Sequence, residues 1–147
     1  MNFQERVEAI LDSLGIGKSY EFQIPFTFDT IYSNRSTSFS YVPLQVLLPK
    51  ISNYLPSGTK VEIVIEVSYN ITGAANGEVQ LYNYTNSTPV TGSVFSIPNA
   101  TWVYAKSGVI DVTAYEGKAV RIGTRRVGGI PTSQVQIESA SLKVKIS

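Results

Sequence analysis

The sequence has neither cysteine nor histidine among its 147 residues. The absence of cysteine excludes disulfides, thiolate zinc sites and thiol catalysis, although it does not assign a compartment. The absence of histidine removes the side chain that most often transfers protons near neutral pH. A chain of this length fits one domain and can bury about 68–70% of its unfolded surface, so its core needs neither a disulfide nor a metal.

Charge is also scarce, at 16% of residues with a net charge of +1. The chain as a whole lacks the excess of basic residues that would indicate a nucleic-acid partner. The distribution is uneven, because seven Lys or Arg accompany three acids from Lys106 onward, whereas the earlier part has five against eight. This is either ordinary scatter over a solvated surface or a mildly basic C-terminal face for an anionic partner.

Long apolar runs are missing as well. The most apolar stretch, 61–67, carries two acids, so no membrane insertion is expected. Glu5, Arg6 and Glu8 interrupt the region where a signal peptide would be apolar, so no signal peptide is visible in this chain.

Residues 3–14 show a helical period. Asn2 is the predicted N-cap, and Gly15 and Gly17 are expected to end the helix. The apolar stripe consists of Phe3, Val7, Ile10, Leu11 and Leu14. Such a stripe must be buried, either against the rest of this chain or against a neighbouring subunit.

The rest of the chain has the two-residue period of β-strands. Pro25 places the first strand at a sheet edge or a bulge, Asn76-Gly77 predicts a hairpin, and a parity slip near Ser139–Ser141 predicts a bulge in the last strand. Strands are predicted at 20–28, 39–48, 61–69, 78–84, 90–97, 100–105, 109–113, 119–127 and 134–146. The predicted fold is all-β, an antiparallel two-sheet jelly-roll sandwich of about eight strands with one N-terminal amphipathic helix. Residues 1–17 form the helix and linker, and 18–147 form the sandwich domain.

Several C-terminal segments carry a family resemblance. They are Trp102-Val103-Tyr104, the step Asp111-Val112-Thr113, the turn Tyr115-Glu116-Gly117-Lys118, the strand Val120-Arg121-Ile122 and the closing Leu142–Ile146. This half resembles the galactose-binding-like jelly rolls, which include many carbohydrate-binding modules, and the resemblance implies a glycan ligand. A sandwich that follows a short helix is also similar to small jelly-roll virion proteins, including those of archaeal viruses, which implies a structural role.

Aromatic and arginine side chains in the second half are the candidate ligand-binding residues. They are Tyr82, Tyr84, Trp102, Tyr104, Arg121 and Arg125. Such rings stack on sugars or anchor protein interfaces, and arginine binds anions, but half-buried strand residues and cross-strand ion pairs give the same pattern. The sequence leaves open whether Trp102 is a binding platform or a core residue.

No catalytic constellation is visible. A serine triad lacks its histidine, and Glu62 and Glu66 lie about 13 Å apart along one strand, too far for a retaining glycosidase. We therefore predict no enzyme and no cofactor. No metal site is predicted, and a structural calcium ion held by Asp111 and backbone carbonyls is the alternative that the sequence leaves open.

Asparagine supplies five Asn-x-Ser/Thr triplets, more than the composition predicts by chance. They begin at Asn34, Asn70, Asn83, Asn86 and Asn99. Glycan acceptors must lie at exposed sites, and the triplets fall in predicted loops or strand ends. They indicate either a glycosylated external protein or the chance clustering of polar loop residues.

Together these features predict a non-catalytic structural or surface protein, a virion or cell-envelope component that self-associates. Its partners would be further copies of itself or another structural protein. The alternative is a carbohydrate-binding module with an aromatic platform. In both cases the expected location is the extracellular surface or a virion.

Overall fold

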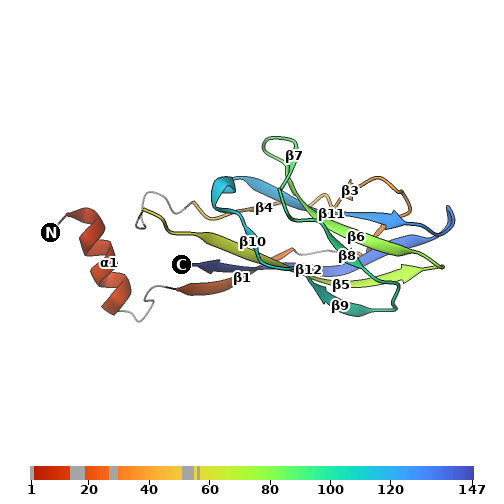
Figure 1. Ribbon diagram of the computed structural model, residues 1–147, viewed down its shortest axis with the longest axis horizontal. Helices are drawn as coiled ribbons and strands as arrows, with labels where there is room; N and C mark the ends of the chain where they lie inside the picture. The colour runs from red at the N-terminus through yellow and green to blue at the C-terminus, as the bar shows by residue number, and fades with distance from the viewer. Residues whose placement is uncertain (1, 14–18, 27–29, 51–54, 56) are drawn as a thin grey trace.

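The computed structural model describes residues 2–13, 19–26, 30–50, 55 and 57–147. Within these ranges the chain forms one α-helix and two antiparallel sheets that pack face to face as a sandwich (Figure 1). The predicted fold class, a β-sandwich with one N-terminal helix, is confirmed.

Each sheet is built from six strand segments. The helix is α1 (Phe3–Ser13), and a 3-10 turn, η1 (Thr113–Tyr115), precedes β11. Sheet A contains β1 (Tyr20–Phe26), β2 (Tyr32–Asn34), β5 (Val61–Thr72), β9 (Val103–Lys106), β10 (Ile110–Asp111) and β12 (Gln134–Ile146). Sheet B contains β3 (Ser40–Tyr41), β4 (Val46–Leu47), β6 (Asn76–Asn83), β7 (Thr88–Pro89), β8 (Phe95–Ile97) and β11 (Ala119–Val127).

Eight of these segments combine in pairs as interrupted edge strands. β1 and β2 both pair with β12, β9 and β10 with β5, β3 and β4 with β11, and β7 and β8 with β6. Counted this way, the described residues form eight strands. When the eight strands are numbered along the chain, neighbouring strands follow the order 1, 8, 3, 6 in sheet A and 2, 7, 4, 5 in sheet B. This order is that of a jelly roll.

The core lies between the two sheets and is formed by alternate residues of the long strands. In β5, for example, Val61, Ile63, Ile65 and Val67 are buried, while the residues between them are partly exposed. Burial of such aliphatic side chains stabilises the fold by about 1.5–3 kcal/mol each. The long strands therefore fix which residues lie on the two outer faces.

The hairpin predicted at Asn76-Gly77 is wrong. β5 belongs to sheet A and β6 to sheet B, so the turn between them carries the chain from one layer to the other. Asn99 holds this turn, because its Nδ2 donates to Gly73 O at 2.6 Å and to Ala75 O at 2.7 Å. The sequence predicts the turn, but it does not show which of the two sheets the following strand joins.

Several predicted strands are shorter or divided. The strand predicted at 39–48 is two segments, β3 and β4, separated around Pro43, which cannot donate a ladder hydrogen bond. The strand predicted at 109–113 is reduced to β10. Two other predictions are confirmed: β1, with Pro25, lies at the edge of sheet A, and β12 has a bulge. The register shifts between Ile137 and Ser139, just before the predicted place.

Candidate functional site

The N-terminus of α1 is capped by a reciprocal pair of hydrogen bonds. Glu5 N donates to Asn2 Oδ1 at 2.8 Å, and Asn2 N donates to Glu5 Oε2 at 3.0 Å. This capping box satisfies backbone donors that the first helical turn leaves free, and it confirms Asn2 as the N-cap. Gly15 and Gly17, predicted to end the helix, lie outside the described residues.

Two residues of the apolar stripe of α1 are exposed to solvent. Phe3 is 66% exposed and Ile10 57% exposed, whereas Val7 is half-buried. The Leu11 side chain and Leu14 lie outside the described residues. Figure 1 shows α1 beyond one end of the sandwich, and no strand in the described part of the chain packs substantially against it. An isolated helix of 11 residues is marginal in water, and Phe3 and Ile10 lack the burial that would stabilise it.

A second group of candidate residues gathers on the outer face of sheet B. Alternation in β6 and β11 turns Val79 and Ile122 inward and places their neighbours outside. We call this surface the aromatic–arginine face. It consists of Phe39, Tyr41, Glu78, Gln80, Tyr82, Tyr84, Arg121 and Arg125. Four of the six predicted ligand-binding residues, Tyr82, Tyr84, Arg121 and Arg125, therefore lie together on one surface.

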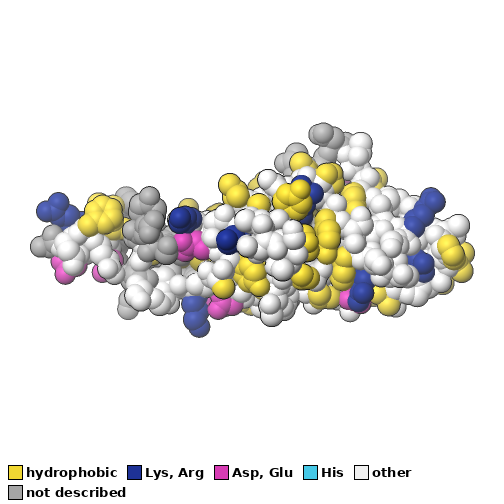
Figure 2. Space-filling view, turned by 90° about the horizontal axis from the view of Figure 1, so that it is seen from above, with side chains coloured by type: hydrophobic (Ala, Val, Ile, Leu, Met, Phe, Trp, Pro, Cys, Tyr) yellow, Lys and Arg dark blue, Asp and Glu magenta, His cyan; other side chains and the backbone are white. Residues whose placement is uncertain are grey.

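The rings and guanidinium groups of this face stack on each other. The rings of Tyr41 and Tyr82 lie 4.1 Å apart at 23°. The guanidinium carbon of Arg121 lies 3.7 Å from the centre of the Tyr84 ring, a distance at which a cation is attracted to an aromatic face. Seen from above, where sheet B forms the upper layer, hydrophobic side chains gather over the middle of the sandwich with Lys or Arg among them (Figure 2).

Tyr41 lies across β11 at Gly123. Its hydroxyl donates to Gln80 Oε1 at 3.3 Å, so the ring spans from β3 to β6 over the glycine. Burial, and secondly the neighbouring Tyr82, raise the pKa of Tyr41, so this hydroxyl keeps its proton. A side chain at position 123 would collide with the ring. The sequence did not point to Phe39 and Tyr41 as site residues, because their pairing with β11 spans about 80 positions.

The two arginines of the face differ in their charge partners. Arg125 Nη2 lies 3.1 and 3.2 Å from the two carboxylate oxygens of Glu78. Arg121 makes no ion pair in the described part of the chain, and its Nε is buried without a hydrogen-bond partner. Arg121 is thus a half-buried cation without a compensating acid among the residues that the structure describes.

Trp102 and Tyr104 lie apart from this face, on the edge of sheet A next to and within β9. Trp102 is 41% exposed and Tyr104 81% exposed. Trp102 also has a φ of 45°, a backbone conformation that bulky residues rarely adopt. Trp102 is therefore a surface residue and not part of the core.

The five predicted glycan acceptors have different surroundings. Asn34 and Asn83 are buried, and Asn34 Nδ2 donates to Thr124 O at 2.6 Å. Asn70 Nδ2 donates to Gln136 Oε1, and Asn99 holds the turn described above. A glycan on Asn34 or Asn99 would displace a hydrogen bond, because each of these Nδ2 atoms donates to two carbonyl oxygens. Asn86, in the turn between β6 and β7, is exposed and presents its side-chain oxygen to Asn83 Nδ2.

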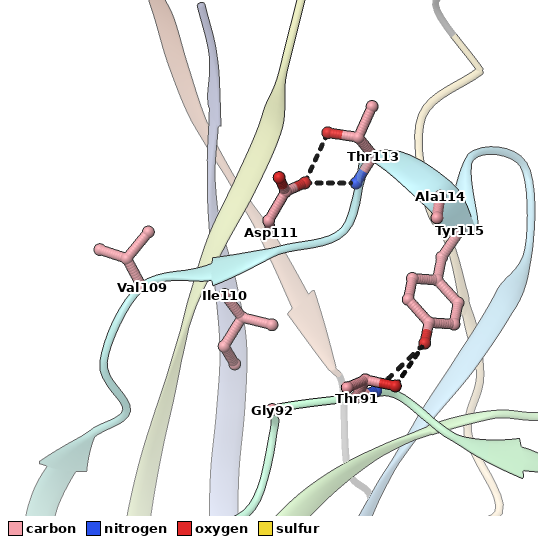
Figure 3. Close-up of a pocket in the computed structure, with 8 residues that line it drawn as sticks. All are labelled: Thr91, Gly92, Val109, Ile110, Asp111, Thr113, Ala114 and Tyr115. Carbon is pink, nitrogen blue, oxygen red and sulfur yellow. Dashed lines mark hydrogen bonds between the residues drawn. The ribbon is translucent and has the colours of Figure 1, made fainter.

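A shallow, open pocket lies at the η1 turn (Figure 3). Asp111 Oδ1 accepts from Thr113 Oγ1 at 2.6 Å and from Thr113 N at 2.9 Å. These bonds, the side-chain one first, lower the pKa of Asp111 and keep it ionised. Tyr115 Oη accepts from Thr91 N at 3.1 Å, on the opposite side of the segment. The polar groups are occupied with each other and do not converge on a ligand.

Register places Asp111 opposite Glu62 on the neighbouring strand, a pair that the sequence did not reveal because about 50 positions separate them. No group of three His, Cys, Asp or Glu able to hold a metal ion occurs within the described ranges. Among the same residues, no helix has the length and apolarity to cross a membrane.

No protein-family model and no curated protein matches the chain. Among solved structures, it is similar to a chain from infectious bursal disease virus, Gx strain, with 15% identity and a TM-score of 0.47, covering 87% of this chain and 32% of that one. It is also similar to the tobacco streak virus coat protein, in a dimer structure (8% identity, TM-score 0.28, covering 83% and 84%) and in another crystal form (13%, 0.26, 83% and 85%). The chain spans about a third of the length of the first of these. Likenesses with TM-scores below 0.5 carry no argument about function.

Proposed function

We propose that this protein is a non-catalytic structural component that self-associates through α1 and contributes to an external surface, such as a virion or a cell envelope. The observation that carries this proposal is the exposure of two residues of the apolar stripe of α1, Phe3 at 66% and Ile10 at 57%. The sandwich buries its core without the helix, so the helix is available for a neighbouring subunit.

A structural role also agrees with the chemistry of the surface. The pocket beside η1 has no converging polar groups, and hydrogen bonds lower the pKa of Asp111, opposite to what a general acid needs. Jelly rolls build both viral capsids and lectins, so the fold alone does not select between these roles.

Light scattering on the full chain and on a chain without residues 1–17 tests the proposal. We expect the full chain to form oligomers and the truncated chain to be a folded monomer. Phe3→Asp should also give a monomer, whereas Gln4→Asp, which adds the same charge at an exposed polar position, should assemble. A folded monomer for the unmodified chain at all concentrations would refute self-association.

The external location has its own test. The chain should be found in purified extracellular particles or in envelope fractions by immunodetection, and a location confined to the cell interior would contradict it. Among the five triplets, Asn86 is the favoured acceptor, because it is exposed and bonds Asn83 through its side-chain oxygen and not its nitrogen. If the chain is glycosylated there, Asn86→Gln removes the added mass and Asn34→Gln does not.

Glycan binding at Trp102 and Tyr104 is a second candidate function. Its support is that both rings are on the surface and Trp102 has a strained backbone, a feature that often accompanies binding sites. Trp102 is the single tryptophan, so the fluorescence of the protein reports on this residue. Because its side chain is exposed, the emission should be red-shifted and readily quenched by iodide. On a glycan array, Trp102→Ala and Tyr104→Ala should abolish binding and Tyr20→Ala should not. Binding that survives both changes would remove these residues from the role.

A further inference from the structure

We infer that the end of the sandwich farthest from α1 docks on a membrane surface that contains anionic phospholipids. Four connections meet at this end, which we call the loop end (Figure 1). They are 35–39 between β2 and β3, 73–75 between β5 and β6, 98–102 between β8 and β9, and 128–133 between β11 and β12. The inference goes beyond the proposed self-association and does not depend on it.

Charge at the loop end has one sign. Its four loops contain no Asp or Glu, whereas Arg35 lies in one of them and Arg126 lies beside it, near the end of β11. Arg126 Nε donates to Arg35 O at 3.0 Å, and its Nη1 donates to Gly128 O. Arg35 Nε donates to Gln134 Oε1 at 3.3 Å. These acceptors are neutral, and neither arginine makes an ion pair in the described part of the chain. The loop end therefore presents two positive charges that attract anionic lipid headgroups.

Exposed apolar side chains lie among these charges. Ile130 is 62% exposed, Trp102 41% and Val127 39%. At the end away from α1, Figure 2 shows hydrophobic and basic side chains and no acid. The turn that presents Ile130 is closed by its own backbone, because Ser133 N donates to Ile130 O at 2.9 Å. A soluble anion would use the arginines alone, whereas a lipid surface also covers aliphatic side chains and tryptophan, a residue enriched at the level of the headgroups.

Other exposed apolar surfaces match an anionic membrane less well. The segment 3–13 has three acids against one base, so α1 is repelled by the same headgroups. Near the exposed Val109, Asp111 lies across from Glu62 on the neighbouring strand. The loop end combines exposed apolar side chains with positive charge. The contact is peripheral, within the headgroup layer, and needs no spanning segment.

Binding to lipid vesicles tests the inference, and Trp102 reports on it. We expect the full chain to sediment with vesicles of equimolar phosphatidylserine and phosphatidylcholine, and not with vesicles of phosphatidylcholine alone. Salt should weaken the binding, because ions screen the charges of the arginines. Trp102 is the single tryptophan, so a blue shift of the fluorescence on binding would place the loop end at the lipid.

Substitutions at the loop end have matched controls elsewhere on the sandwich. Arg35→Glu and Ile130→Asp should each weaken binding by about tenfold or more, because each brings a carboxylate to the anionic surface. Lys143→Glu makes the first charge change on the outer face of sheet A, and Val109→Asp makes the second change at a side chain of similar exposure, 67%. Both controls should bind like the unmodified chain. All four positions are exposed, so we expect the variants to fold.

The outcomes keep this inference apart from the proposed self-association. Phe3→Asp should still require phosphatidylserine and still show the blue shift, although it loses any avidity that assembly supplies. The inference is overturned if the unmodified chain does not bind the anionic vesicles, or if Arg35→Glu and Ile130→Asp both bind as it does. If Phe3→Asp alone abolishes binding, α1 is the contact and the inference also fails. Equal binding of dextran sulfate in solution, unchanged by Ile130→Asp, would mean a site for soluble polyanions and not for a membrane.

Discussion

At the scale of single residues, Tyr69 connects the two layers of the sandwich. Its ring is 1% exposed in β5 of sheet A, and its hydroxyl donates to Pro98 O at 2.8 Å, just after β8 of sheet B. Burial raises the pKa of Tyr69 above its usual 10.0. The protonated hydroxyl therefore stabilises the folded state.

We predict that Tyr69→Phe lowers the free energy of unfolding by about 1–2 kcal/mol at neutral pH, because the Pro98 carbonyl loses its donor. The folded-state pKa is raised, so the contribution of Tyr69 is fully present below pH 10.0 and is lost as the pH rises through the folded value. The difference between the two proteins in urea denaturation should narrow at alkaline pH. Tyr104→Phe, at an 81% exposed site, should have no effect at any pH.

Residue types alone do not reveal such roles. Asn34 begins a glycosylation triplet, but its amide is buried and bonds a carbonyl 90 positions away. Strand alternation could not show whether Trp102 is buried or exposed, because this residue lies just before β9 and has a positive φ. By contrast, Tyr82, Tyr84, Arg121 and Arg125 were chosen by residue type, and the structure does bring them together. Whether they bind anything is still a prediction.

At the scale of elements, the contact of β3 with β11 depends on the absence of one side chain. Tyr41 lies over Gly123 and stacks on Tyr82, which joins three strands of sheet B on their outer side. The backbone at Gly123 does not have a positive φ, so the reason for glycine is the space that the ring occupies.

Gly123→Ala should therefore displace Tyr41 and destabilise the protein by about 1–3 kcal/mol, a range typical of overpacking. Most of this loss should disappear when Tyr41 is changed to Ser in the same chain, because the collision is then absent. A double-mutant cycle of unfolding free energies measures the coupling. Additive effects would mean that the ring does not rest on Gly123.

The period of the sequence predicted individual elements well where side chains alternate between core and solvent. The strand β5 and the bulge in β12 follow from burial alone, and the helix α1 follows from the helical period of its apolar residues. The sequence was less informative about which strands pair with each other. Asn76-Gly77 has the composition of a hairpin turn, but the inward side chains of β6 complete the layer opposite β5, and no local feature records that.

At the scale of the whole molecule, the sandwich and α1 should behave as thermodynamically separate parts. No strand in the described part of the chain packs substantially against the helix. We predict that removing residues 1–17 changes the free energy of unfolding of dilute monomer by less than about 0.5 kcal/mol, since changes away from packed regions are usually this small. Urea denaturation at low concentration measures it. A larger loss would show that the helix is packed on its own sandwich.

The position of β12 sets the order in which the molecule can form. β12 follows all the other strands of sheet A in the sequence, yet it pairs with β5 on one side and with β1 and β2 on the other. During synthesis, the ribosome makes all the other strands of sheet A before the strand that joins them. The early strands must wait with unpaired edges, a state prone to aggregation, and their long-range pairing makes folding slow. The emergence of β12, and not of the first half of the chain, is the event that allows sheet A to close.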